Sequence, residues 1–397
     1  MRKRWIVLGL ATAVGLMAAA TLIVLVQPEA PAPLVPATAI DHAEHARTIE
    51  AMRRQVRPGR ERPVIAIVAL NEATEVTDLL VPYGVLSRAD VAEIAVVAEQ
   101  AGPIALHPFG VRKGPELLRV DPHATLSAFD ERHPDGADYV IVPAMQPRDS
   151  KAVLAWIAAQ YRKGARIVSV CNGAITLAAA GLLDGRRATA HWNGIRELQA
   201  GHPTMQWVPD RRYVVDNGIV TSTGISAAMP VAVALAEAIA GRPKAAELAA
   251  ALGLSGWDAR HRSSAFRLDA RHKRTFVRNW LSLWRHESIG VLLEESVDEI
   301  ALALTADAYA RTALTSVVTV GPGGAVHSKH GLMLRPVAAS GAVSMERMLV
   351  PPRGDAPALA IERVLAQIAK RFDRPTAAIV ALAMEYPWTG EAELETR

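Results

Sequence analysis

The sequence is nearly free of cysteine, since Cys171 is the only one in 397 residues. One thiol cannot form an internal disulfide and cannot supply a cysteine-rich metal site. No Gly-Lys-Ser/Thr segment follows an apolar strand, so a phosphate-binding loop of the Walker type is absent. His42 and His45 are close in sequence but have no further ligands at metal-site spacing. We therefore expect no metal and no cofactor.

The sequence also lacks a strong charge of one sign. Lys and Arg number 44 against 40 Asp and Glu, which gives a net charge of +4. This excess is spread along the chain, without a dense basic stripe interleaved with aromatic residues, so we expect no nucleic-acid partner. Half of the residues are hydrophobic, which is enough for helices packed on sheets. The length predicts two domains after any targeting segment is removed.

The N-terminus combines basic residues with a long apolar run. Residues 5–26 are uncharged and about as long as a helix that spans a bilayer. We expect an uncleaved transmembrane anchor over 1–26, with a cytoplasmic N-terminus and a periplasmic globular part. A cleavable signal peptide is the alternative, with 18–20 as its cleavage site. We expect residues 27–62 to be a Pro-rich and basic linker, in which Asp41 caps a short helix.

The next part of the chain alternates between strand and helix patterns. Residues 64–70 form a continuous apolar run of the kind found in buried parallel strands. Further strands are expected at 92–97 and 139–143, and residues 104–120 have the polarity of a hairpin. A helix with one apolar side is expected over 150–163. This alternation predicts an α/β domain with a mostly parallel sheet.

The following strand leads into Cys171 and Gly173, the pattern of a nucleophile elbow. Gly173 would permit a tight strand-to-helix turn where a Cβ would collide. Cys171 would then lie at the carboxyl edge of the sheet, where ligands bind in such folds, and at a helix N-terminus, which favours the thiolate. The alternative is an inert cysteine that packs as a small hydrophobe.

A reactive thiol needs a base or a cationic partner at neutral pH, and imidazole suits that role. His191 follows a short strand after the elbow helix, which makes it a candidate partner for Cys171. Spacing alone favours a histidine that merely ends a strand.

Several motifs in one order resemble the ThiJ/PfpI superfamily, which has a flavodoxin-like, class I glutamine amidotransferase-like fold. They lie at residues 77–82, 142–143, 169–174, 181–192 and 218–224. The branch that looks most similar contains isonitrile hydratase-like enzymes and the amidase-like sensor domain of AraC-type regulators, in which Thr-x-His-Trp follows Gly-Leu-Leu-x-Gly. The resemblance covers about residues 63–265 and implies helices on both faces of the sheet.

The resemblance implies that Cys171 is the nucleophile, that His191 lies beside it and that Asp78 is the acid touching the thiol. The substrate-binding residues that we expect are Asn172, Gly173, Ala144, Met145 and Trp192. Relatives usually carry two glycines where this chain has Ala144-Met145. A conformation with positive φ would be strained there by roughly 1 kcal/mol or more. The backbone amides at this position can stabilise an oxyanion in relatives.

Residues 283–397 resemble a reduced copy of the same unit. At a constant offset, residues 76–97 match 297–318, with Asp78 over Glu299. No cysteine elbow follows, so we expect a truncated, degenerate α/β repeat that scaffolds or pairs with the first domain. A chance agreement between two Ala-rich segments is the alternative.

Residues 266–282 are expected to form a basic connector between the two parts. Its arginine and aromatic residues could contact acidic lipid head groups or a partner, although a solvated helix face is the commoner meaning of such charge.

Taken together, these patterns predict a membrane-anchored ThiJ/PfpI-like protein with a Cys-His-acid site. By resemblance it would be a hydrolase, hydratase or glyoxalase-like enzyme acting on a small electrophile. The alternative is a non-catalytic ligand sensor or scaffold, as in AraC-type regulators, which the Ala144-Met145 exchange and the elbow-less second half favour. The expected partners are a small-molecule substrate or ligand and the membrane, and a homodimer is implied by analogy alone.

Overall fold

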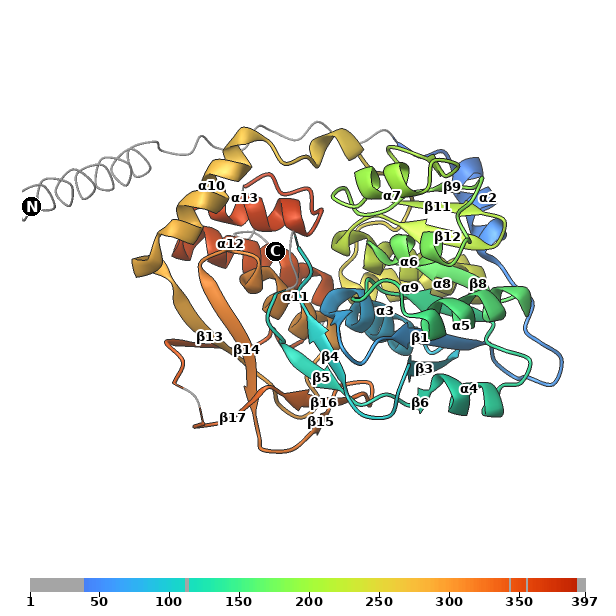
Figure 1. Ribbon diagram of the computed structural model, residues 1–397, viewed down its shortest axis with the longest axis horizontal. Helices are drawn as coiled ribbons and strands as arrows, with labels where there is room; N and C mark the ends of the chain where they lie inside the picture. The colour runs from blue at the N-terminus through green and yellow to red at the C-terminus, as the bar shows by residue number, and fades with distance from the viewer. Residues whose placement is uncertain (1–38, 111–113, 343, 355, 391–397) are drawn as a thin grey trace, which may run out of the picture.

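The computed structural model describes residues 39–110, 114–342, 344–354 and 356–390 (Figure 1). The anchor expected over 1–26 lies outside these residues. Within the described ranges, no helix is both long and apolar enough to cross a membrane.

The first half is built on a seven-stranded sheet in the order β11-β12-β8-β7-β1-β3-β6. Its strands are β1 Val64–Ala69, β3 Glu93–Ala98, β6 Ala124–Thr125, β7 Tyr139–Val142, β8 Arg166–Ser169, β11 Tyr213–Asp216 and β12 Ile219–Ser222. All neighbouring pairs are parallel except β11 with β12. The predicted mixed α/β architecture with a mostly parallel sheet is confirmed.

Helices cover both faces of this sheet, because alternate residues of each strand point to opposite sides. Ile65 and Ile67 of β1 belong to one core, and Ala66 and Val68 belong to the other. The first core contains α3 Val76–Ala89, α8 Ala228–Ala240 and α9 Arg242–Leu252. The second contains α4 Leu126–Arg132, α5 Lys151–Arg162, α6 Gly173–Ala179 and α7 Ile195–Gly201.

The second half contains a four-stranded parallel sheet, in the order β17-β14-β13-β18. Its elements are β13 Glu287–Leu292, α11 Glu299–Ala310, β14 Thr315–Gly321, β17 Ala338–Ala339, β18 Arg347–Leu349, α12 Ala360–Arg371 and α13 Arg374–Ala383. The central β13-α11-β14 unit has the same order as β1-α3-β3 in the first half. The sheet stops at β18, where the first half continues from β7 to β8 and the elbow.

A shared five-stranded sheet joins the two halves in the order β15-β16-β5-β4-β2. Its strands are β2 Thr74–Glu75, β4 Ile104–His107, β5 Leu118–Val120, β15 Val326–His327 and β16 Met333–Pro336. Strands β4 and β5 form the hairpin predicted over 104–120, and β5 pairs antiparallel with β16 of the second half. Helices α3 and α11 also pack against each other across this boundary (Figure 1).

The described part of the expected linker is folded. Helix α2 (His42–Met52) is capped by Asp41, as predicted, and it packs on α8. Three arginines after this helix form salt bridges with the fully buried Asp138. The distances are 3.2 Å for Arg54, 3.4 Å for Arg57 and 2.7 Å for Arg60. The end of the segment 27–62 is therefore part of the first half.

The expected basic connector also has regular secondary structure. It contains helix α10, Ala270–Leu281. The remaining elements are β9 Arg187–Ala188, β10 Gln206–Trp207, η1 Ile225–Ala227, η2 Ser263–Ala265, η3 Leu283–Arg285 and η4 Pro357–Leu359.

Candidate functional site

The chain turns sharply at Cys171, between strand β8 and helix α6. Cys171 has a φ of 56°, in the left-handed region that side chains other than glycine seldom adopt. A Cβ on Gly173 would lie only 2.0 Å from the carbonyl oxygen of Val142, so only glycine fits there. The thiol is thereby held at the carboxyl edge of the sheet.

The thiol of Cys171 is enclosed rather than presented to solvent, because the residue is only 5% exposed. Burial raises the pKa of Cys171 well above its ordinary value, and the carboxyls of Asp78 and Glu75 add to that rise. The expected preference for thiolate is therefore wrong for this structure: desolvation and nearby acids outweigh the dipole of α6, and the thiol is neutral.

Asp78 lies on α3 and is fully buried. Its Oδ2 accepts a hydrogen bond of 3.0 Å from the amide of Ala144, while its Oδ1 has no partner within the described residues. Burial raises the pKa of Asp78 to about 7. No hydrogen bond joins it to Cys171 among the described contacts.

Glu75 caps the N-terminus of α3 beside Asp78, and burial together with Asp78 raises the pKa of Glu75 as well. The hydrogen bonds decide which of the two carboxyls holds a proton. Glu75 accepts from the Asp78 amide and the Thr77 hydroxyl, both at 2.7 Å, and from Arg311 at 3.0 Å. Three donors favour an ionised Glu75, so we place the proton on Asp78.

Arg311 reaches this cluster from the end of α11, in the second half. Its Nη2 lies 3.0 Å from Glu75 and its Nε lies 2.8 Å from Asp307. Although burial acts to lower it, Asp307 and Glu75 raise the pKa of Arg311 overall, so the guanidinium stays charged. Glu75, Asp307 and Arg311 were not predicted from the sequence. The only usable signal was the sequence match that aligned the segment of α3 with the segment of α11.

His191 is buried, and no hydrogen bond joins it to Cys171 among the described residues. Its Nε2 donates to the carbonyl oxygen of Ala383 at 3.0 Å, and its Nδ1 lies 2.8 Å from Oδ1 of Asn193. Burial lowers the pKa of His191, although Glu385 acts in the opposite direction, so the imidazole is neutral. No described hydrogen bond therefore joins the expected thiol and base, and their pairing stays a prediction.

The partner that holds His191 is the segment 382–385 at the end of α13, which we call the C-terminal clasp. The indole of Trp192 donates to the carbonyl of Leu382 at 2.9 Å. The amide of Gly224 donates to Oε2 of Glu385 at 2.7 Å, and the hydroxyl of Ser226 donates to the Glu385 carbonyl at 2.6 Å. The clasp thus covers two loops of the first half at once.

The remaining expected residues are engaged within the fold. Asn172 donates from Nδ2 to Oδ1 of Asn193 at 2.9 Å. Ala144 and Met145 are buried, and neither has a positive φ, so the expected strain is absent. The Ala144 amide already donates to Asp78, which leaves it unavailable to an oxyanion.

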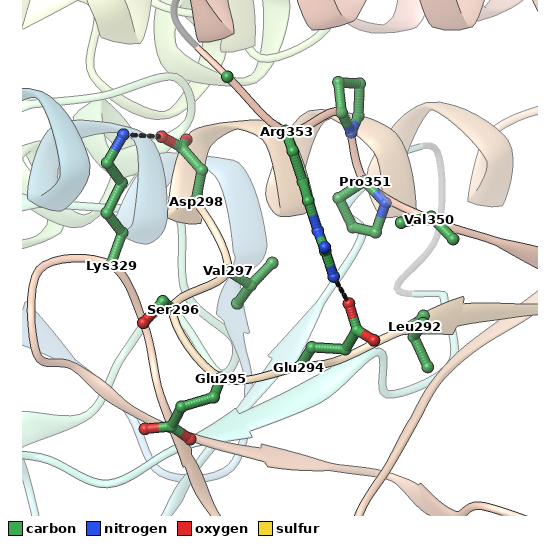
Figure 2. Close-up of a pocket in the computed structure, with 12 residues that line it drawn as sticks. Leu292, Glu294, Glu295, Ser296, Val297, Asp298, Lys329, Val350, Pro351 and Arg353 are labelled. Carbon is green, nitrogen blue, oxygen red and sulfur yellow. Dashed lines mark hydrogen bonds and ion pairs between the residues drawn. The ribbon is translucent and has the colours of Figure 1, made fainter.

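Cys171 does not line either of two hollows found among the described residues. One hollow, of about 620 Å³, lies beyond the carboxyl ends of strands β1 and β3. Asn71, Glu99 and Ser150 are among the residues that line it. Figure 2 shows the other, of about 240 Å³, beyond β13 and β18 of the second half. Its wall contains the ion pair of Arg353 with Glu294. In the part of the chain that the structure describes, no group of three or more His, Cys, Asp or Glu is placed to hold a metal.

Residues 64–238 match the family described as the DJ-1/PfpI family, which confirms the resemblance drawn from the motifs. The curated "HTH-type transcriptional regulator CdhR" of Pseudomonas aeruginosa is 41% identical over 54 residues, 14% of this chain and 16% of that protein. An "uncharacterized protein in cpoL 5'region" of Streptomyces lividans is 63% identical over 30 residues, 8% of this chain and 21% of that protein. These matches therefore span only a small part of each curated relative.

Three solved structures are similar to about half of the chain. Toxoplasma gondii DJ-1 is 24% identical with a TM-score of 0.41, and the match covers 49% of this chain and 99% of that one. Drosophila melanogaster DJ-1beta is 20% identical with a TM-score of 0.42, covering 49% and 99%. A ThiJ/PfpI family protein from Pseudomonas syringae is 24% identical with a TM-score of 0.41, covering 49% and 75%.

Proposed function

We propose that the DJ-1/PfpI domain over residues 64–238 is a small-molecule sensor whose state is read by the C-terminal half. The observation that carries the proposal is the hydrogen bond from His191 Nε2 to the Ala383 carbonyl. The imidazole that would activate the thiol is bound by the C-terminal clasp instead. The buried neutral thiol of Cys171 and the engaged amide of Ala144 agree with binding rather than turnover.

The same contacts supply a route from the site to the second half. A ligand that enters beside Cys171 changes the charge balance of Glu75 and Arg311, or displaces the C-terminal clasp from His191. Both events favour one arrangement of the two halves over another, which is what a coupled binding equilibrium requires. One curated relative is by name a transcriptional regulator, which agrees with a regulatory role.

We also propose that residues 283–397 are the truncated, degenerate copy that the sequence predicts, serving as an internal partner of the first half. Reciprocal ion pairs support this: Arg311 of α11 binds Glu75 at the start of α3, and Arg88 of α3 binds Asp298 at the start of α11. Isologous interfaces between two copies show this reciprocity. An internal partner would take the place of a second copy of the chain, so we expect a monomer by sedimentation.

For the location of the chain, we propose that residues 1–26 anchor it with the globular part in the periplasm. The support is the sequence alone, a basic N-terminus followed by an apolar run. Protease added to spheroplasts should digest the globular part, whereas protection until lysis would contradict this orientation.

The sensor proposal is tested with Cys171 as its own probe, because it is the only thiol. We expect wild-type full-length chain to react slowly with iodoacetamide at pH 7, and to convert methylglyoxal no faster than Cys171→Ser. Glu385→Gln and Ser226→Ala should loosen the C-terminal clasp and raise the alkylation rate about tenfold, a loss of about 1.4 kcal/mol of protection. Glu346→Gln, which alters an acid elsewhere in the second half, should leave the rate unchanged.

The second candidate is a cysteine-dependent enzyme, and the left-handed backbone at Cys171 favours it. Strain of this kind is retained mainly at functional sites. A protonated Asp78 could also donate to a thiolate. Cys171-dependent turnover by the wild-type chain would overturn the sensor proposal in favour of this one. Turnover only in the clasp variants would identify an enzyme held shut by its second half.

A further inference from the structure

Helix α10 carries its apolar side chains on its outer side. Phe276 is 48% exposed and Trp280 is 63% exposed, and Trp284, in the turn that follows, is 72% exposed. The full set, which we call the α10 patch, is Phe276, Val277, Trp280, Leu281, Leu283 and Trp284. A contiguous apolar surface of this kind on a folded protein marks a place where something binds.

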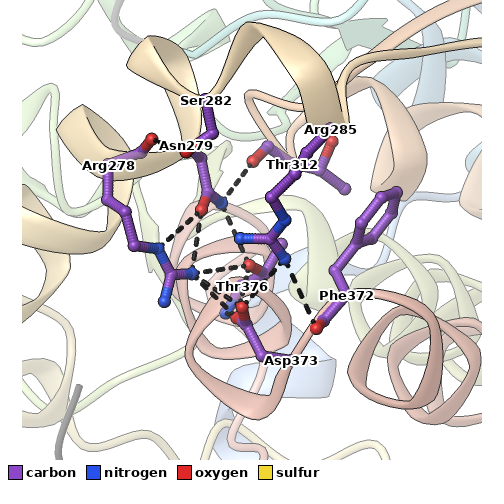
Figure 3. Close-up of polar contacts among 8 residues, drawn as sticks. All are labelled: Arg278, Asn279, Ser282, Arg285, Thr312, Phe372, Asp373 and Thr376. Carbon is purple, nitrogen blue, oxygen red and sulfur yellow. Dashed lines mark hydrogen bonds and ion pairs between the residues drawn. The ribbon is translucent and has the colours of Figure 1, made fainter. Parts of the chain in front are cut away.

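The polar side of α10 faces the body and fixes this orientation, as Figure 3 shows. The buried amide of Asn279 donates to the Thr312 carbonyl and to the Thr376 hydroxyl, both at 3.0 Å. Arg278 pairs with Asp373 at 2.8 Å, and Arg285 pairs with the same carboxylate at 3.0 Å. Turning the apolar side inward would break these bonds and bury unpaired polar groups, so the outward exposure is built in.

The charged residues within the α10 segment itself are of one sign. No acidic residue occurs between Asp269 and Glu287 in the sequence, and Lys273 and Arg274 are exposed on α10. Tryptophan rings bordered by lysine and arginine are the composition of helices that lie in the interface of an anionic bilayer. The rings enter the boundary between head groups and acyl chains, while long basic side chains reach the phosphates.

We propose that the α10 patch docks on the surface of an anionic lipid bilayer. Residues 5–26, an uncharged apolar run of the same chain, favour a bilayer over a protein partner as the occupant, because that run would keep α10 close to a membrane. The inference does not depend on the sensor proposal, since none of the α10 residues belongs to the Cys171 site.

The test uses the full chain with vesicles of phosphatidylcholine and phosphatidylglycerol in which some acyl chains carry bromine, a quencher of tryptophan. We expect wild-type fluorescence to be quenched by brominated lipid, and this component to be lost in Trp280→Ser/Trp284→Ser. Lys273→Gln and Arg274→Gln should each weaken the partitioning of the patch about fivefold in vesicles that contain phosphatidylglycerol, and should have little effect in phosphatidylcholine alone. Met348→Ser/Val350→Ser, an exposed apolar pair elsewhere in the second half, is the matched control.

Equal quenching in the wild type and in Trp280→Ser/Trp284→Ser would overturn the proposal, provided that both have the same thermal unfolding midpoint. A change from dimer to monomer caused by the same pair of substitutions in lipid-free solution would overturn it in another way, by assigning the patch to contact between copies. Because neither Trp280 nor Trp284 makes a side-chain hydrogen bond within the described residues, we expect the doubly substituted variant to fold.

Discussion

The two halves of the molecule share a β-α-β frame and differ in what lies beyond it. In the first half the sheet continues through β8, and Cys171 closes a buried cluster of acids. In the second half the sheet stops at β18, and the corresponding edge opens into the hollow of Figure 2. The frame alone therefore does not determine the chemistry, which depends on the strand that follows it.

The two ion pairs that join α3 to α11 also differ, in how deeply their side chains are buried. The side chains of Arg311 and Glu75 are 5% and 1% exposed, whereas those of Arg88 and Asp298 are 13% and 8% exposed. Asp298 also has Lys329 within 3.9 Å as a second cation. Corresponding positions of the two helices thus carry one enclosed ion pair, Arg311 with Glu75, and one that is better hydrated, Arg88 with Asp298.

The strongest test of this inequality removes one arginine from each pair. Arg311→Ala should lower the free energy of unfolding by about 3–5 kcal/mol, because it leaves buried acids without their cation. Arg88→Ala should cost about 1–2 kcal/mol, since water and Lys329 can serve Asp298. Urea denaturation of the full chain measures both, and equal losses would show that the two pairs are equivalent after all.

A second comparison inserts one methyl group at a glycine of each half. At Gly173 the new Cβ would meet the backbone oxygen of Val142 at 2.0 Å, and the backbone must move, at about 3 kcal/mol. At Gly290 of β13 the nearest atom is the sulfur of Met348 at 2.4 Å, and that side chain can rotate away. Gly290→Ala should therefore cost less than about 1.5 kcal/mol, and thermal unfolding of both variants would reveal any reversal of this order.

The fold was predictable because its signals are local. Continuous apolar runs such as β1 are typical of buried parallel strands, and Gly173 beside a lone cysteine indicated the turn at Cys171. The matching segments also aligned α3 with α11 in the sequence, although the N-caps of the two helices, Glu75 and Asp298, lie two residues away from the predicted offset.

The candidate site was less predictable because its decisive contacts join distant parts of the chain. Nothing local in the sequence indicates that Ala383 accepts the hydrogen bond of His191, or that Arg311 neutralises Glu75. Burial then reverses the expectation for Cys171: helix N-termini favour thiolates, but desolvation and two neighbouring acids act more strongly. Such balances depend on tertiary packing, which spacing cannot supply.

The smallest effect that we expect is on the pH dependence of stability. It concerns Asp78 and Glu299, the two acids that the sequence match aligned with each other. Burial raises the pKa of Asp78 to about 7, so its contribution to stability is complete below pH 4 and is lost as the pH rises through 7. For Glu299, burial acts to raise the pKa, but hydrogen bonds with His330 and Ser328 lower it overall. Its contribution is therefore present above the unfolded value and is lost as the solution becomes more acidic than the folded pKa.

Substituting each acid by its amide should change opposite ends of the pH profile. We expect Asp78→Asn to remove a fall of about 2–4 °C in the unfolding midpoint between pH 5 and pH 7.5. Glu299→Gln should lower the midpoint by about 2 °C at pH 7, and this difference should disappear below about pH 4. Thermal unfolding measured across pH distinguishes the two variants. If both substitutions changed the midpoint in the same pH range, the two acids would have the same environment despite the different strands that follow them.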